Sequence, residues 1–302
     1  MNQSLDIYKT RLEKDFPDLN ADKIRLIGSG WHHDAIEVNG SLVFRMPRGV
    51  HADSGDLEID FETQLLEKLG QRLSVDIPLT KHVDPSGHYF GYTKVKGVQL
   101  TSIVDSMTEA QTEELISDWI VIASNIHSSI SVDEARSIGA PDFEGFDPEL
   151  SIEGANRIFN ATGVDSRVLD FAKEIISQTR ELSTSKRSEL FIHNDLQFHN
   201  LIADPETKRI TGVIDWTDAC IGTIEREFAI WEWIKYDLLR TVTQLYEDQV
   251  GASVDVSKVL CWRSAEDISD YAEHLAVNDR QEADAAKQRI YKLMEVYSSV
   301  DS

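Results

Sequence analysis

The sequence predicts an α+β protein with a small β-rich N-terminal part and a larger helical C-terminal part. Three patterns lead to this prediction. Short β-prone segments punctuated by glycine fill the N-terminal part, helical patterns dominate from Gln99 onward, and a few short β-like runs interrupt the helical part around Asn200. We therefore expect one domain at residues 1–95 and a second at residues 96–302.

The small domain is expected to be an antiparallel sheet with one inserted helix. The dipeptide Asn39-Gly40 is a strong signal for a two-residue hairpin turn. A helix is expected where Phe61, Leu65 and Leu69 recur at helical spacing, and the sequence DPSG is typical of a turn between two later strands. The expected elements are strands at 23–30, 34–39 and 41–48, a helix at 56–73, and strand-like segments within 75–84 and 88–97.

The larger domain is expected to be mainly helical. Thr108 precedes a run with apolar residues at helical spacing and is a candidate N-cap. The β-like runs ELFIH, NLIAD and RITGVIDW lie between helical segments, and the turn DPETK separates the last two. The expected helices are 108–128, 148–159, 165–182 and 223–251, followed by further helical segments toward the C-terminus.

The charge balance restricts the partners. The chain has 30 Lys and Arg residues against 53 Asp and Glu residues, a formal net charge of -23. Such a surface repels nucleic acid and anionic membranes and attracts cations, although acidity also promotes solubility by itself. We expect no nucleic-acid or membrane partner, and a monomer.

The cysteines and the hydropathy pattern indicate the compartment. Cys220 and Cys261 are too few for a disulfide framework or a zinc cage. No signal peptide is visible at the N-terminus, and no apolar stretch approaches the roughly 20 residues needed to cross a bilayer. We expect a cytoplasmic protein.

The segment 191–219 carries the residues with the clearest chemistry. Asp195 is followed five residues later by Asn200, and Asp215 comes fifteen residues after that. Phosphoryl transfer needs a carboxylate that orients and deprotonates the attacking hydroxyl, and oxygen ligands that hold Mg²⁺ on the phosphates. Asp195 is the candidate for the first role, and Asn200 with Asp215 for the second, because two β-like runs joined by a turn would bring them to adjacent strand ends.

Two other interpretations remain open at this point. His193, His199 and Asp195 could form a hydrolase-type metal set, since His and carboxylate side chains bind zinc and iron. That set needs further ligands, and only one later histidine, His274, is present. The second interpretation is a polar loop without chemistry.

The same segment resembles a known family. HNDLQFHN is similar to the H-G-D-L-x-x-x-N catalytic loop of the aminoglycoside phosphotransferase family, and GVIDW to that family's metal-binding IDF or IDW. The resemblance implies a bilobal protein-kinase-like fold with a small β-rich N-lobe and a larger helical C-lobe. It also implies that Asp195 is the catalytic base, that Asn200 and Asp215 bind Mg²⁺, and that His193 supports the catalytic loop.

The resemblance extends into the small domain and implies a nucleotide site there. Arg45 would contact the phosphates and pair with Glu62, and Ser29 with Gly30 would lie over the triphosphate. Arg45 departs from the Lys of protein kinases, and Asn194 from the usual Gly of the family's loop. Glu227 takes the position of an Asp that anchors that loop. The residues expected to line the purine pocket are Tyr92, Thr93, Lys94 and Val95.

The acceptor is expected to be a cationic molecule. On the side where the resembling family receives its acceptor, this chain has an acidic neighbourhood, although solvated surface explains each residue separately. Aromatic residues at helical spacing could form either a core or a substrate platform. The acceptor-binding candidates are Asp218, Glu225, Trp231, Glu232 and Tyr236.

The expected function is therefore Mg²⁺-dependent transfer of the γ-phosphate of ATP or GTP to a hydroxyl of a cationic antibiotic. An aminoglycoside suits the acidity best, because several ammonium groups profit from nearby carboxylates. A macrolide is the alternative acceptor, followed by a small metabolic alcohol such as choline or an amino sugar. A catalytically silent kinase-like binding module is the alternative outside enzymes, and it predicts loss of Asp195 or Asp215, which are both present.

Overall fold

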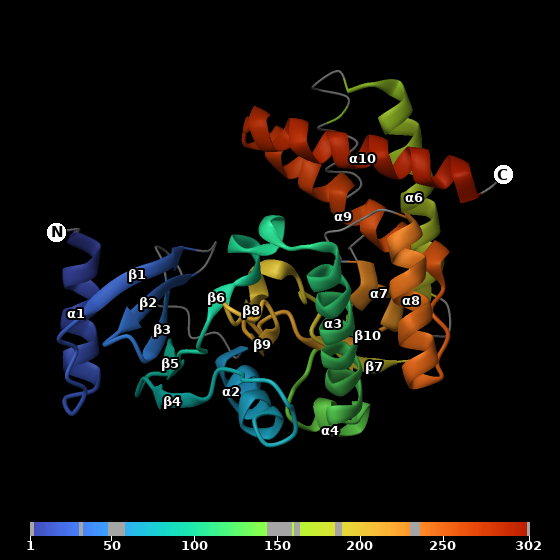
Figure 1. Ribbon diagram of the computed structural model, residues 1–302. Coiled ribbons are helices and arrows are strands. Elements are labelled where there is room, and N and C mark those ends of the chain that lie inside the picture. The colour runs from blue at the N-terminus through green and yellow to red at the C-terminus, as the bar shows by residue number, and fades with distance from the viewer. Residues whose placement is uncertain are drawn as a thin grey trace. The chain divides into compact units, whose positions relative to one another are not determined.

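The computed structural model describes residues 3–29, 33–47, 58–143, 159, 164–184, 189–229 and 236–300. The chain forms two compact units, one from residues 1–140 and 195–219 and the other from residues 141–194 and 220–302. The first contains an antiparallel sheet and the second is mainly helical, which confirms the predicted α+β class (Figure 1). The predicted domain boundary between residues 95 and 96 stays a prediction.

The first unit is built on a five-stranded antiparallel sheet in the order β1-β2-β3-β5-β4. Asn39 and Gly40 adopt φ values of 54° and 72° and close the β2–β3 hairpin, as a type I′ turn requires. The predicted order of three strands, a helix and two strands is confirmed. The elements are β1 (Ile24–Ser29), β2 (His33–Val38), β3 (Leu42–Pro47), α2 (Glu58–Leu69), β4 (Thr80–Val83) and β5 (Phe90–Thr93).

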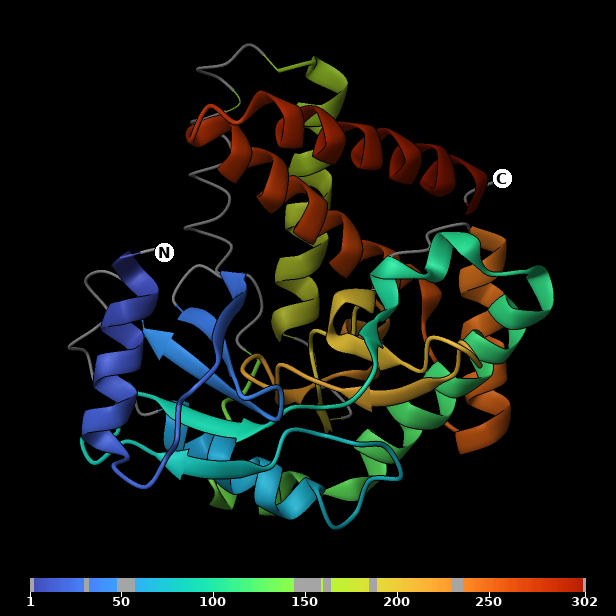
Figure 2. The same cartoon turned by 60° about the vertical axis from the view of Figure 1, so that its left-hand side comes forward.

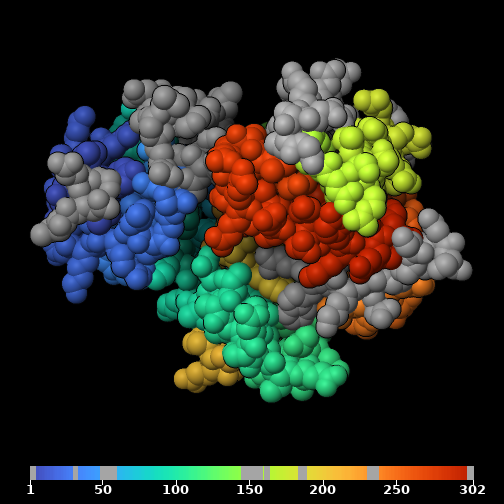
Figure 3. Space-filling view, turned by 90° about the horizontal axis from the view of Figure 1, so that it is seen from above, coloured from blue at the N-terminus to red at the C-terminus, as the bar shows by residue number. Residues whose placement is uncertain are grey.

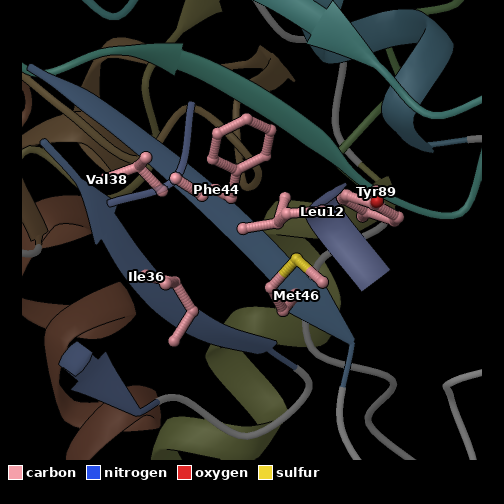
Figure 4. Packing of buried hydrophobic residues seen from close by; sticks show 7 residues of the cluster. Leu12, Ile36, Val38, Phe44, Met46 and Tyr89 are labelled. Carbon is pink, nitrogen blue, oxygen red and sulfur yellow. The ribbon is translucent and has the colours of Figure 1, made fainter. Parts of the chain in front are cut away.

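A helix that the sequence patterns did not reveal, α1 (Gln3–Asp15), covers one face of this sheet (Figure 2). Successive residues of a strand point to opposite faces, so Ile36, Phe44 and Met46 face α1, where they pack around Leu12 (Figure 4). The residues between them on β2 and β3 face the other way. The sheet therefore has an apolar face under α1 and a second face whose side chains are available for a site.

The first unit also contains a three-stranded sheet in the order β6-β8-β9, with α3 beside β9. Gly97 (φ 128°) precedes β6, and a Cβ there would clash with the carbonyl oxygen of Ala203. Thr108 caps α3 in a capping box with Gln111, as predicted. The elements are β6 (Val98–Gln99), η2 (Leu100–Ser102), η3 (Val104–Ser106), α3 (Glu109–Ser129), α4 (Val132–Ser137), η4 (Phe198–Asn200), β8 (Leu201–Ala203) and β9 (Ile210–Val213).

The second unit packs its long helices around α9, with α10 and α6 against it; Figure 3 shows the outer surface of α10 in red and part of α6 in yellow-green. A two-stranded sheet pairs β10 with β7. The predicted helix at 148–159 lies outside the described residues apart from Phe159. The elements are α6 (Ser166–Thr184), β7 (Leu190–Ile192), β10 (Cys220–Gly222), α7 (Ile224–Ala229), α8 (Tyr236–Val250), α9 (Val256–Ala276) and α10 (Arg280–Val300). None of the helices in the described ranges is long and apolar enough to cross a membrane.

The packing of α1 generates a stability prediction. Leu12→Ala leaves a cavity in the apolar cluster and should lower the free energy of unfolding by about 2–5 kcal/mol. Ile7→Ala, on the same helix but with the side chain 65% exposed, is the matched control and should change it by under about 0.5 kcal/mol. Urea unfolding followed by circular dichroism measures both. Equal effects of the two variants would show that α1 is not held by this cluster.

Candidate functional site

A cavity of about 980 Å³ lies within the first unit, on the face of the sheet opposite α1. Its volume is in the range of small-molecule sites. The strands β1, β2, β3 and β5 supply one side, and η4, β8 and the segment that follows β9 supply the other. Eight residues predicted to belong to a functional site line it: Ser29, Arg45, Tyr92, Lys94, Val95, Asn200, Asp215 and Asp218.

Amide donors hold the carboxylate of Asp195 from both sides. Gln197 Nε2 donates to Asp195 Oδ1 at 2.8 Å, and Asn200 Nδ2 donates to Oδ2 at 2.7 Å and to the Asp195 carbonyl at 3.0 Å. Trp119 of α3 donates its indole N–H to the carbonyl of Leu196 at 3.1 Å. The loop from Asp195 to Asn200 therefore has a fixed side-chain and backbone conformation.

The hairpin of β8 and β9 brings Asn200 and Asp215 together, as the sequence predicts. The backbone N–H of Ile214 donates to the Asn200 carbonyl at 2.9 Å, which places the residue after Ile214 next to the start of β8. Asn200 is buried, and its Nδ2 is used by Asp195, so its Oδ1 is the atom suited to a metal. Asp215 has a left-handed backbone conformation (φ 60°) at the end of β9.

Arg45 joins three separate segments at the cavity. Its Nη1 donates to Glu62 of α2 at 3.0 and 3.2 Å, to Asp215 Oδ1 at 3.4 Å, and to the hydroxyl of Thr217. Burial alone would lower the pKa of Arg45, but the carboxylates of Glu62 and Asp215 raise it above its usual value. The structure therefore contains the pair of Arg45 and Glu62 that the resemblance implies. Arg45 is a permanent cation beside Asp215.

A second charged group lies on the sheet side of the cavity. Buried Glu37 accepts from Lys94 Nζ and, at 3.1 Å, from Arg25 Nη2. The hydrogen bond from Lys94, and then that from Arg25, hold the pKa of Glu37 below its usual value. Lys94 and Arg25 line the cavity, so this side presents cationic groups held by one carboxylate.

The predicted purine-pocket residues differ in their side-chain contacts and in their backbone hydrogen bonds. Burial raises the pKa of Tyr92, whose ring lies 5.6 Å from that of Phe90. The backbone N–H groups of Thr93 and Lys94 are used by the carbonyls of Leu79 and Ser41. Tyr92, Lys94 and Val95 line the cavity. Among the backbone hydrogen bonds described for these residues, none uses the N–H of Val95.

The second unit holds the backbone just before Asp195. Glu227 is buried in α7, and its carboxylate accepts the backbone N–H of His193 at 3.2 Å and of Asn194 at 2.7 Å. Asn194 is left-handed (φ 63°), and its Oδ1 accepts from Arg226 Nε at 2.8 Å. His193 is fully buried at the end of β7. Asn194 is thus held by both its backbone and its side chain.

The acceptor-binding candidates are placed only in part. Asp218 lines the cavity of the first unit, and Glu225 lies in the first turn of α7 in the second unit. Tyr236 begins α8, although its side chain lies outside what the structure describes. Gly30, Trp231 and Glu232 lie outside the described residues.

The hydrolase interpretation has no geometric support in the described part of the chain. No group of three or more His, Cys, Asp or Glu side chains there is arranged to hold a metal ion. His199 is half-exposed, with Nε2 3.5 Å from Asp195 Oδ2. His193, His199 and Asp195 do not form the proposed set.

Gln197 and Thr217 are among the site residues that the sequence did not predict. Gln197 lies inside the catalytic-loop motif, at a position where the motif accepts any residue, and Thr217 lies two residues after Asp215. Thr217 donates to Asp215 Oδ1 at 2.9 Å and accepts from Arg45. Their closeness to the two motifs could have indicated a role for these side chains. The atoms that they contact, however, depend on the fold and not on the local sequence.

Solved structures of antibiotic-modifying enzymes share this fold. The chain is similar to the GDP and kanamycin complex of APH(2'')-IIIa, with 21% identity, a TM-score of 0.77, and coverage of 96% of this chain and 98% of that one. It is also similar to the streptomycin-ATP-APH(2'')-IIa ternary complex (18%, TM-score 0.62, 95% and 97%). A third structure is the macrolide 2'-phosphotransferase MphH from Brachybacterium faecium (15%, TM-score 0.63, 94% and 97%). At these identities the likeness shows the fold, which is the kinase-like fold that the sequence predicts.

Family membership rests on the sequence match. The model of the phosphotransferase enzyme family matches residues 23–247, which is most of the chain and includes the whole cavity lining. The same range contains Asp195, Asn200 and Asp215 in the geometry described above. The chain belongs to the phosphotransferase enzyme family and is a kinase-like phosphotransferase.

Proposed function

We propose that this protein transfers the γ-phosphate of ATP or GTP, with Mg²⁺, to a hydroxyl of a cationic antibiotic, and that the acceptor is an aminoglycoside. One observation carries the proposal. Arg45, Asn200 and Asp215 line a single cavity, and Asp195 is tied to Asn200 by a hydrogen bond. A cation, two oxygen ligands and a carboxylate base are the groups that phosphoryl transfer requires.

In the proposed reaction Asp195 orients the acceptor hydroxyl and takes its proton as the oxygen attacks the γ-phosphorus. The bond between the γ-phosphorus and the β–γ bridging oxygen breaks, and the nucleoside diphosphate leaves. The amide donors of Gln197 and Asn200 stabilise the ionised carboxylate and fix its direction. Positioning by these donors suits a reaction whose transition state needs little covalent help. Arg45 would contact the transferred phosphate while Glu62 keeps its guanidinium in place.

The residues present fit a Mg²⁺ ion. Asn200 Oδ1 and the half-exposed carboxylate of Asp215 are hard oxygen ligands on adjacent ends of β8 and β9. When bound, the ion would neutralise charge on the nucleotide phosphates. Thr217 and Arg45 hold Asp215 Oδ1 from the side of the sheet.

The nucleotide would bind across the sheet side of the cavity, with Ser29 and Gly30 over its phosphates. Tyr92, Lys94 and Val95 would line the purine pocket, and the backbone of Val95 would offer the hydrogen bonds that Thr93 and Lys94 spend inside the sheet. Glu227 would support the catalytic loop by holding the backbone of His193 and Asn194. We infer a cytoplasmic monomer.

The acceptor class rests on charge and on the similar structures. A net charge of -23 favours a polycationic ligand, and Asp218 supplies a carboxylate at the cavity. Glu225, Trp231, Glu232 and Tyr236 remain proposed acceptor contacts. Kanamycin and streptomycin appear in the complexes of two similar structures. A macrolide is the second candidate, because macrolide 2'-phosphotransferases share the fold with TM-scores of 0.64 and 0.63.

Replacing the base should separate chemistry from binding. Asp195→Ala should lower kcat by at least about 10²-fold, because the hydroxyl loses its proton acceptor, and should leave the nucleotide Kd nearly unchanged. Coupled nucleotide-consumption assays and calorimetric titration with GDP and ADP measure the two quantities. Glu206→Gln, an exposed carboxylate in the turn between β8 and β9, is the control and should retain full turnover. Turnover in Asp195→Ala equal to the wild type would remove this residue as the base.

The acceptor is tested by a panel assayed with ATP and GTP in parallel. We expect turnover with at least one aminoglycoside, such as kanamycin, and none with choline, with mass spectrometry showing one added phosphate. Turnover should disappear when EDTA removes the divalent metal, because the phosphate charge is then not neutralised. Turnover confined to macrolides would establish the second candidate. No turnover with any antibiotic would contradict the proposed acceptor class.

The anchor of the catalytic loop is tested by a neutral isostere. Glu227→Gln replaces one acceptor oxygen by an amide NH₂ that faces a backbone N–H, so the unfolding free energy should fall by about 1–3 kcal/mol. The value of kcat should fall as well, because Asp195 follows the anchored residues directly. Glu273→Gln, an exposed change on α9, is the control. Full stability and full kcat in Glu227→Gln would show that the two N–H groups do not depend on this carboxylate.

A further inference from the structure

A chain of hydrogen bonds runs from α1 to the rim of the cavity through a buried carboxylate. Tyr8 of α1 donates its hydroxyl to Asp34 Oδ2 at 2.7 Å, and Ser29 donates its hydroxyl to Asp34 Oδ1 at 2.6 Å. Asp34, on β2, is only 7% exposed. Each carboxylate oxygen therefore has its own hydroxyl donor, and all three residues belong to the first unit.

The position of Asp34 in the sheet explains how these hydrogen bonds connect the helix α1 to the cavity. On β2, Ile36 and Asp34 point to the α1 face, whereas Ala35 between them lines the cavity. Ser29 is the register partner of Asp34 across the β1–β2 pair and is itself at the cavity. Asp34 thus connects the covered face of the sheet with the last described residue of β1.

The helix α1 holds Tyr8 in place, because two other residues on the same side of α1 are bound to the rest of the first unit. Tyr8, Leu12 and Asp15 recur at intervals of four and three residues, which puts them on one face of the helix. Leu12 is buried in the apolar cluster, and Asp15 accepts from the hydroxyl of Tyr89 at 2.8 Å. Tyr8 therefore approaches Asp34 from a fixed support.

We propose that Tyr8 and Asp34 are positioning residues for nucleotide binding, and that α1 tightens the nucleotide site by holding Ser29 at the cavity rim. This inference rests on the proposed function for the site itself. The hydroxyl of Ser29 is engaged by Asp34, so Ser29 contributes to phosphate binding through the placement of its backbone. The family match begins at residue 23, after α1, so Tyr8 lies outside the matched pattern.

Two substitutions test whether the hydrogen bonds from Tyr8 and Ser29 to Asp34 matter for nucleotide binding. Tyr8→Phe keeps the ring on the sheet but removes one donor from a buried carboxylate, which loosens the hold on Ser29. Asp34→Asn keeps the shape but leaves one oxygen for two hydroxyl donors. Both changes should weaken nucleotide binding without touching the groups that do the chemistry.

Tyr89→Phe is a matched control on the same helix contact. It removes the hydroxyl that donates to Asp15, so it also takes one hydrogen bond from the docking of α1, but Tyr89 has no bond to Asp34 or Ser29 among those described. A purely structural role of α1 would make Tyr8→Phe and Tyr89→Phe equivalent. A positioning role distinguishes them.

The experiment measures the Kd of ADP and GDP with Mg²⁺ by calorimetry for the wild type and the three variants, with kcat and KM for each substrate. We expect Tyr8→Phe and Asp34→Asn to raise the nucleotide Kd about threefold to tenfold. The values of kcat and of the acceptor KM should stay within about twofold, and Tyr89→Phe should leave the nucleotide Kd unchanged.

A double-mutant comparison of Tyr8 and Ser29 gives a second measurement. In the Tyr8→Phe background, Ser29→Ala should add less to the nucleotide Kd than it does alone, because the two hydroxyls act through one carboxylate. Additive effects, or equal effects of Tyr8→Phe and Tyr89→Phe, would overturn this inference alone. A wild-type protein that binds neither ADP nor GDP would instead overturn the proposed function, and with it the role given to this chain.

Discussion

The arrangement of the site depends on the guanidinium of Arg45. This group contacts Glu62 on α2, Asp215 after β9 and the hydroxyl of Thr217, so one cation connects a strand, a helix and a turn that are far apart in the sequence. A buried cation is costly without partners, and the surrounding carboxylates offset that cost while raising its pKa. All four of these hydrogen bonds are donated by one guanidinium nitrogen, Nη1.

The loops that contain Asn194 and Asp215 are ordered by hydrogen bonds to side chains. Asn194 and Asp215 both adopt left-handed conformations, which cost energy for residues other than glycine and persist only where neighbours hold them. Glu227 and Arg226 hold Asn194, whereas Thr217 and Arg45 hold Asp215. The polar side chains near Asp195 thus hold two left-handed turn residues, in addition to the chemical roles proposed for this segment.

The five-stranded sheet separates support from function by its two faces. Ile36, Phe44 and Met46 pack under α1, and Arg45 between them in sequence reaches the cavity. Asp34 is an exception within this alternation, because a charged group lies on the covered face and is satisfied there by hydroxyls. Such a satisfied buried carboxylate links the order of the helix to the order of the cavity rim.

The local elements and the motif residues of the candidate site could be predicted from the amino-acid sequence. The Asn39-Gly40 turn, the Thr108 cap and the spacing of Asp195, Asn200 and Asp215 depend on neighbours within a few residues or on one hairpin, so their patterns are readable directly. The folded structure was needed to show that α1 covers the sheet, that Thr217 accepts from Arg45, and that Tyr8 donates to Asp34. Those contacts join segments distant in the chain, and the direction of a hydroxyl depends on packing that no local pattern records.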